Sequence, residues 1–192
     1  MADANGKAAT IEILNGKMIV HKGSDLSFPV LTNNTYDESV RSVKNSSSNG
    51  NNSLERFGEA CKMIQQLSTL KISKPLTDYA FDILGEVDQG DFTKWSIGYD
   101  ITNKTIQFKT NRFKQVKTVN FSAFDFNCTA AAKVWDINQT ANGAINNLFQ
   151  DFNNDINKRI VETATKESES NVSINQKNRE RLWQYASKIK CN

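Results

Sequence analysis

The sequence predicts an α+β protein in which strands and helices alternate in blocks along the chain. Apolar residues alternate with polar ones over residues 8–21 and again over 93–121, which is the two-residue period of half-buried strands. Over residues 54–67, 76–84 and 145–161 they recur at the three- and four-residue spacing of amphipathic helices. The order of strands, helices, strands and helices favours a sandwich of antiparallel sheet and helices.

The first two strands are expected to form a hairpin. Residues 8–14 and 17–21 are β-prone runs, and Asn15-Gly16 separates them. Asn-Gly between two such runs is the strongest short hairpin signal, because both central residues of the turn require a positive φ.

A third strand is expected over residues 27–32, with Pro29 near its start or at a sheet edge because proline cannot donate to a ladder. A short helix is expected over residues 36–43, with Thr35 as a candidate cap.

Helices dominate the middle of the chain. Residues 45–53 contain only Asn, Ser and Gly, which predicts a loop. A helix should follow over residues 54–67. A second should run from Pro75, a residue suited to a first helical turn, to Gly85.

Strands return after this helical block. Residues 93–101 and 105–110 are expected to pair, and shorter strands are expected over 116–121 and 133–137. From residue 144 the apolar spacing becomes helical and predicts one long helix that reaches residue 161 or beyond.

The predicted domain therefore spans residues 1–165. A polar linker is expected over residues 166–173, and residues 174–192 should form a C-terminal amphipathic helix, capped by Ser173, that packs on the domain.

Composition excludes several functional classes. The chain has 24 Lys and Arg against 21 Asp and Glu, so the net charge of +3 does not demand a polyanion-binding face, and no nucleic-acid partner is expected. Three widely spaced cysteines and one histidine cannot form a common zinc site, so neither a metal nor a cofactor is expected. Since no apolar run is long enough to span a bilayer, no membrane association is expected either.

Three side chains with nucleophilic or acid–base chemistry have ordinary structural explanations. His21 ends a predicted strand, and no partner for catalysis follows from spacing. Cys61 lies on the apolar stripe of its helix and Cys128 in an Ala-rich segment, so both are expected to be small buried hydrophobic residues, and a disulfide scaffold is not expected.

Charged residues at helical spacing are likewise expected to be solvated. Asp78, Asp82 and Glu86 are four residues apart, as on an exposed helix face. The basic run at residues 177–190 is expected to be a solvated helix that docks through its apolar side.

Two polar residues have less ordinary positions. Asn33 stands at the tip of an apolar segment, where side chains often face clefts. Arg56 stands near a helix N-terminus, which the helix dipole disfavours for a cation, so a nearby anion or partner would explain it.

Five motifs occur in an order that resembles a known family. They lie at residues 3–6 leading into 9–17, at 30–37, at 53–57, at 95–105 and at 108–110. In this order they resemble the C-terminal portion of the choloylglycine hydrolase family, which contains bile salt hydrolases, penicillin V acylases and related linear-amide C–N hydrolases. The resemblance covers roughly residues 2–137.

The resemblance implies an Ntn-hydrolase-like αββα sandwich with antiparallel sheets, incomplete at its N-terminus. It implies amide hydrolysis through an acyl-enzyme on an N-terminal cysteine. By the same resemblance, Asn33 would donate its side-chain N–H to the oxyanion, and Arg56 would favour the thiolate of the nucleophile.

The same comparison implies that the nucleophile is absent, because no cysteine precedes Cys61. The chain is therefore expected to be a fragment, a truncated gene product or one half of a split enzyme, inactive alone. Its expected partners are a small-molecule amide and an N-terminal half or further copies of itself. The alternative is a non-catalytic relative used for binding or assembly. Localisation, cytoplasmic or periplasmic, stays open.

Overall fold

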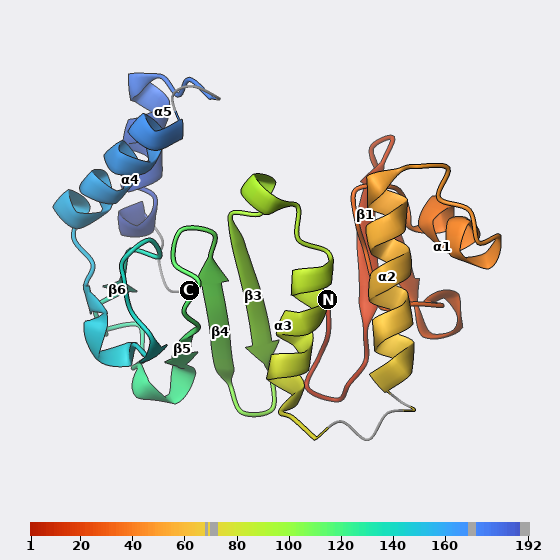
Figure 1. Ribbon diagram of the computed structural model, residues 1–192. Coiled ribbons are helices and arrows are strands. Elements are labelled where there is room, and N and C mark those ends of the chain that lie inside the picture. Colours follow the sequence, from red (N-terminus) through yellow and green to blue (C-terminus); the bar gives the residue numbers. More distant parts are fainter. Residues whose placement is uncertain (68, 70–72, 169–171, 189–192) are drawn as a thin grey trace. The chain divides into compact units, whose positions relative to one another are not determined.

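The computed structural model describes residues 1–67, 69, 73–168 and 172–188 (Figure 1). The chain divides into two compact units, with the boundary between residues 111 and 112. Both units mix helices with strands, so the predicted α+β class is confirmed. The described helices include none with the length and apolar character needed to cross a membrane. The predicted division into a domain over residues 1–165, a linker and a terminal helix stays a prediction.

The first unit opens with the predicted hairpin. Strands β1 (Ala9–Leu14) and β2 (Lys17–Lys22) pair antiparallel, with Ile11 opposite Val20. The turn residues Asn15 and Gly16 have φ values of 52° and 74°, as the Asn-Gly signal requires.

The third strand predicted over residues 27–32 is wrong, because this segment consists of bends and coil. Pro29 cannot donate to a ladder, and the neighbouring side chains pack on helices instead. Phe28 and Val30 contact a buried cluster made by Tyr36, Val40, Phe57 and Cys61.

Two helices supply that cluster. Helix α1 (Tyr36–Lys44) begins at the predicted cap, where Thr35 Oγ1 accepts a hydrogen bond from the Glu38 N–H at 3.4 Å. Helix α2 (Asn52–Leu67) starts two residues earlier than predicted. The Phe57 ring is fully buried and meets the rings of Phe28 and Tyr36 edge-on, so the core of this unit lies between helices and coil.

The first unit closes with a helix and a second hairpin. Helix α3 (Leu76–Glu86) follows Pro75 as predicted, and strands β3 (Trp95–Asp100) and β4 (Thr105–Thr110) pair antiparallel. Helix α3 packs on β3, where Gly98 lies against the Phe81 ring.

The second unit holds short strands. Strand β5 (Lys117–Asn120) pairs in parallel with β7 (Gly143–Ala144), and β6 (Lys133–Val134) pairs antiparallel with β8 (Gln150–Asp151). The long helix predicted from residue 144 is therefore wrong over its first ten residues.

The apolar residues that suggested this helix are used differently. Ile145 is fully buried beside β7, and Phe149 packs against the rings of Phe124 and Trp135. These residues are three and four residues apart, but the backbone between them is irregular. The spacing of apolar residues alone does not distinguish such a segment from a helix.

The unit ends in two helices. Helix α4 (Asn154–Ser168) contacts α5 (Gln176–Trp183), and Asn157 Nδ2 donates to the Trp183 carbonyl at 2.8 Å. Asn175 rather than Ser173 caps α5. Residues 189–192, the end of the predicted helix, lie outside the described residues.

Candidate functional site

Asn33 and Arg56, the two residues singled out from the sequence, contact each other. Arg56 Nη2 donates a hydrogen bond of 2.7 Å to Asn33 Oδ1 across 23 residues of chain. Arg56 Nε donates to Asn52 Oδ1 at 2.9 Å. The guanidinium is therefore held at two of its nitrogens by two amide oxygens.

Helix α2 sets the position of Arg56. Asn51 Oδ1 accepts hydrogen bonds from the N–H groups of Ser53 and Leu54 at 2.9 and 3.3 Å, and thereby caps the helix. Arg56 stands about one turn further on, half-buried. From the sequence, a nearby anion or partner is expected to explain a cation near a helix N-terminus. The described partners of Arg56 are neutral amide oxygens, so a partner explains its position and an anion is not needed.

The backbone around Asn33 is pinned to the same helix end. The Asn34 N–H donates to Ser53 Oγ at 3.0 Å, and Thr32 Oγ1 donates to the Ser53 carbonyl at 3.1 Å. The Ser53 hydroxyl in turn donates to Thr32 Oγ1 at 3.1 Å. Both neighbours of Asn33 therefore bind one buried serine. These contacts fix the position of the Asn33 backbone, although the segment has no regular secondary structure.

Sequence reasoning missed this role of Ser53. It assigned the residue to a polar loop and to the start of a motif. The one available signal was its place three residues before Arg56 in that motif.

The Arg56 contact also fixes which way the Asn33 amide faces. A guanidinium carries only hydrogen-bond donors, so the amide oxygen must face Arg56. The Nδ2 donor then points away from Arg56, and the Asn33 side chain is exposed. This arrangement can present a neutral N–H to an oxygen atom that develops negative charge.

Neither described cysteine is a nucleophile for this site. Cys61 is buried, and burial raises the pKa of its thiol to about 12, so the thiolate is disfavoured. This confirms the structural interpretation of Cys61. Cys128 is exposed and disulfide-bonded, so its predicted burial as a small hydrophobic residue is wrong.

The acidic residues of α3 confirm the solvated interpretation. Asp78, Asp82 and Glu86 are all exposed, and Asp82 forms an ion pair with Lys74. The basic run at the C-terminus does dock through an apolar residue: Trp183 is buried against α4, beneath the Lys158 ammonium.

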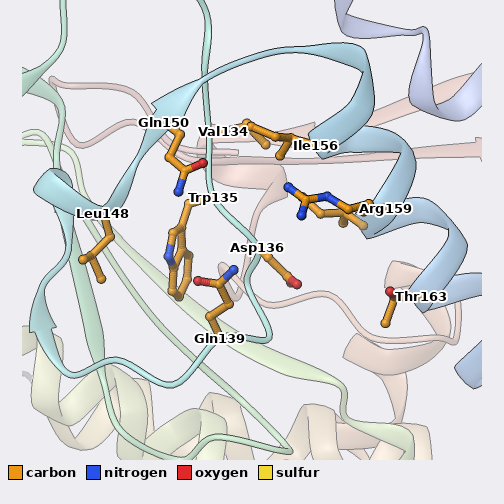
Figure 2. A pocket seen from close by; sticks show the side chains of 10 residues that line it. Val134, Trp135, Asp136, Gln139, Leu148, Gln150, Ile156, Arg159 and Thr163 are labelled. Carbon is orange, nitrogen blue, oxygen red and sulfur yellow. The ribbon is translucent and has the colours of Figure 1, made fainter.

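A pocket of about 370 Å³ opens in the second unit. Figure 2 shows Trp135, which follows β6, and Arg159 of α4 on its wall. Its wall combines aliphatic side chains with amides, one carboxylate, one guanidinium and one hydroxyl, and contains no cysteine, serine or histidine. Its other lining residues are Val134, Asp136, Gln139, Leu148, Gln150, Ile156, Ile160 and Thr163.

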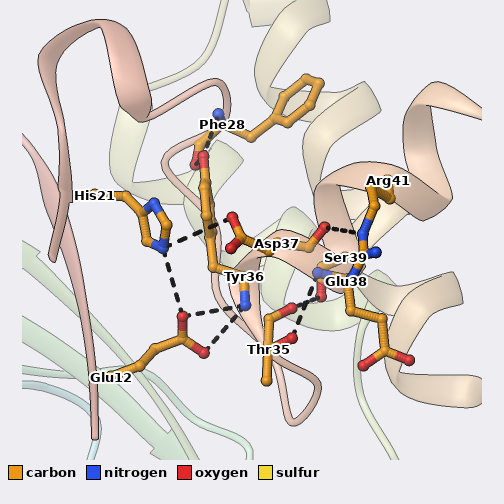
Figure 3. A network of polar contacts seen from close by, with 9 residues as sticks. All are labelled: Glu12, His21, Phe28, Thr35, Tyr36, Asp37, Glu38, Ser39 and Arg41. Carbon is orange, nitrogen blue, oxygen red and sulfur yellow. Dashed lines mark hydrogen bonds and ion pairs between the residues drawn. The ribbon is translucent and has the colours of Figure 1, made fainter. Parts of the chain in front are cut away.

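His21 belongs to a polar network that joins the first hairpin to α1 (Figure 3). Its Nε2 lies 3.8 Å from Glu12 Oε2 and 4.0 Å from Asp37 Oδ1. The centroid of its ring lies 4.4 Å from that of Tyr36, with the two rings tilted by 35°. Glu12 accepts the Tyr36 N–H at 3.0 Å. The histidine is thus a strand-end residue with a structural role.

Among the described residues no three ligand-type side chains are arranged to hold a metal ion.

No protein-family model matches the sequence, and no curated protein does. Among solved structures, penicillin V acylase from Agrobacterium tumefaciens matches 79% of this chain with a TM-score of 0.62 and 21% sequence identity. The match covers 55% of the acylase, so this chain spans about half the length of that structure. The likeness establishes the fold: the chain shares the mixed helix-and-sheet architecture of this acylase.

Proposed function

We propose that this chain carries the oxyanion-stabilising part of a linear-amide C–N hydrolase that cleaves conjugated bile salts, penicillin V or similar N-acyl amides. The observation that carries the proposal is the Arg56–Asn33 hydrogen bond, which orients an amide donor on a backbone pinned to Ser53. The likeness of fold to a penicillin V acylase supports it.

In the proposed reaction a thiolate attacks the amide carbonyl, and the carbonyl oxygen becomes negatively charged. Asn33 Nδ2 donates a hydrogen bond to that oxygen, which is effective because the donor is oriented before the reaction begins. The amine then leaves with a proton, and water hydrolyses the thioester to a carboxylate. The positive charge of Arg56 favours the thiolate over the thiol.

The thiolate would come from a residue other than the two described cysteines, since Cys61 is buried and Cys128 is disulfide-bonded. The same observation favours a second candidate function, in which the chain is a non-catalytic relative that binds or assembles. The two candidates differ in whether Asn33 affects turnover.

The test is hydrolysis of phenoxymethylpenicillin and of taurine-conjugated bile salts by the protein purified from the cells that produce it, with bound polypeptides retained. We expect turnover of at least one substrate. Asn33→Ala should lower kcat about a hundredfold or more, because one oxyanion donor is lost.

The matched control is Asn34→Ala, which removes the side-chain amide of the adjacent residue. Asn34 binds Ser53 through its backbone N–H, so the variant keeps that contact. It should keep near-normal kcat. The absence of turnover with every substrate would favour the non-catalytic relative, and equal kcat for Asn33→Ala and wild type would exclude Asn33 as the oxyanion donor.

A further inference from the structure

The asparagines of this chain recur in one short motif more often than chance predicts. Asn-x-Ser/Thr, with a residue other than proline in the middle, is the acceptor motif for N-linked glycans on surface loops of secreted proteins. The sequence contains 23 Asn, and about one residue in six is Ser or Thr, so about four such motifs are expected at random. Eight are present, at Asn33, Asn45, Asn51, Asn103, Asn120, Asn127, Asn138 and Asn171.

The structure exposes the asparagines of this motif to water. All seven that it describes are exposed. The described asparagines that are half-buried all lie outside the motif, namely Asn34, Asn111, Asn146 and Asn157. Because an attached glycan must extend from the folded protein into solvent, the described motifs all lie where a glycan is sterically allowed.

Two of these seven side chains form no hydrogen bond with the described residues. Asn45 ends α1, and Asn138 lies in a turn after β6. The hydroxyl residues of their motifs, Ser47 and Thr140, are exposed as well. The other five side chains each form at least one hydrogen bond within the fold, namely those of Asn33, Asn51, Asn103, Asn120 and Asn127. The amides of Asn45 and Asn138 can therefore carry a sugar without the loss of a described contact.

A disulfide supplies an independent observation about the compartment. Cys128 is exposed and disulfide-bonded. Disulfides persist in oxidising environments such as the lumen of the endoplasmic reticulum and are rare where glutathione and thioredoxin keep thiols reduced. An exposed disulfide is open to such reduction, since exchange depends on access for the attacking thiolate. N-linked glycans are attached in the same oxidising lumen, so the disulfide and the motifs point to one compartment.

We propose that Asn45 and Asn138 carry N-linked glycans, and that the protein folds in the oxidising lumen of a secretory pathway. The co-reactant is an oligosaccharide joined to a polyprenyl lipid through a diphosphate. The asparagine Nδ2 forms a bond to the anomeric carbon of the first sugar and gives up one proton. The bond from that carbon to the diphosphate oxygen breaks, and the lipid diphosphate leaves with the electron pair.

The experiment uses the protein purified from the cells that produce it. A peptide-N-glycosidase acting in water labelled with heavy oxygen converts each glycosylated asparagine to a labelled aspartate, which mass spectrometry locates. A parallel digest without the enzyme measures spontaneous deamidation. The Asn-Gly pairs at residues 5–6, 15–16, 49–50 and 142–143 are the internal references for that side reaction.

We expect the enzyme-dependent label at both Asn45 and Asn138 in most copies of the protein. Absence of the label at either position would overturn the proposal. An intact disulfide at Cys128 without either label would indicate another oxidising compartment, such as a periplasm, and would overturn it as well.

Paired substitutions at the hydroxyl position separate the motif from any structural effect. Thr140→Ser keeps the motif at Asn138, whereas Thr140→Ala abolishes it and leaves the asparagine in place. Ser47→Thr and Ser47→Ala are the corresponding pair for Asn45. In the same cells, each alanine variant should lose the mass of one glycan on a denaturing gel, and each hydroxyl variant should keep it. Equal mobility within a pair would contradict the proposal.

Thiol trapping tests the compartment separately. Living cells are treated with N-ethylmaleimide, and the protein is then digested without reduction. Cys128 is exposed, so it would be alkylated if it were a free thiol; we expect no alkylation. Cys61, which is buried, is the control thiol that reacts once the protein is denatured. Complete alkylation of Cys128 in living cells would overturn the proposed compartment.

The glycan inference and the proposed function fail in different ways. Asn33 also lies in the motif, and the proposed function requires its Nδ2 to stay unmodified, so the same digest should show no label there. A label at Asn33 would exclude it as the oxyanion donor. Amide hydrolysis by a protein without glycans on Asn45 and Asn138 would keep the function and overturn the glycan inference.

Discussion

The two sides of the β1–β2 hairpin differ in what holds them. Toward the helices the contacts are polar, with Glu12 on the Tyr36 N–H and His21 between two carboxylates. Leu14 and Ile19 lie on this same side and are half-buried. On the other side Ile11, Ile13, Met18 and Val20 are exposed, and we call these four residues the outer face. The hairpin is therefore held from the helix side, by polar contacts together with partly buried apolar side chains.

The buried cluster around Phe57 shows the contrast. There the side chains of α1, α2 and the coil segment exclude water, so each removed atom leaves a cavity. On the outer face, the removal of an atom leaves no cavity and only reduces the apolar surface that is exposed to water. Substitutions on the two sides should therefore differ in their effect on the isolated chain.

The largest difference is expected between Phe57→Ala and Ile13→Ala. Phe57 is fully buried, so its truncation should lower the free energy of unfolding by about 3–5 kcal/mol. Ile13→Ala should change it by less than about 0.5 kcal/mol. Urea denaturation of both variants measures the two values, and similar losses would show that the outer face is already packed in the isolated chain.

A smaller loss is expected for Tyr36→Phe. The Tyr36 hydroxyl accepts the Phe28 N–H at 2.9 Å and donates to the Phe28 carbonyl at 3.1 Å. Its removal should cost about 1–2 kcal/mol, because the partly buried Phe28 groups lose their partner. Thermal unfolding would detect this, and a loss below about 0.3 kcal/mol would mean that water replaces the hydroxyl.

The pH dependence of stability should report the burial of Cys61. Burial raises the thiol pKa to about 12, so above pH ~8.5 the unfolded thiol ionises while the folded thiol stays protonated. The free energy of unfolding should therefore fall as pH rises, by up to about 1.4 kcal/mol per pH unit from this group.

Cys61→Ala isolates that contribution from other groups that titrate in the same range. Chemical denaturation at pH 8 and pH 10 should show a smaller decrease for the variant than for wild type. Parallel profiles would indicate that the thiol is accessible to water in the folded state.

Local signals in the sequence predicted local structure well. Asn15-Gly16 specified the hairpin and Thr35 the start of α1, because each depends on the conformation of a few adjacent residues. The strand expected over residues 27–32 was wrong, because a strand needs a partner and these residues pack on helices instead.

The candidate site shows a different limit. The resemblance pointed to Asn33 and Arg56, but nothing in their spacing implied a direct hydrogen bond across 23 residues. Nor could the sequence show that Ser53 binds the Thr32 hydroxyl and the Asn34 N–H on the two sides of Asn33, since those contacts depend on how the coil segment meets α2.

The central claim is that Asn33, oriented by its hydrogen bond with Arg56, donates to the oxyanion of a linear-amide hydrolysis. The most direct measurement is kcat of Asn33→Ala against wild type and Asn34→Ala, in the protein isolated with its bound polypeptides. A loss of about a hundredfold or more for Asn33→Ala alone is the predicted result, and equal kcat in all three would contradict the claim.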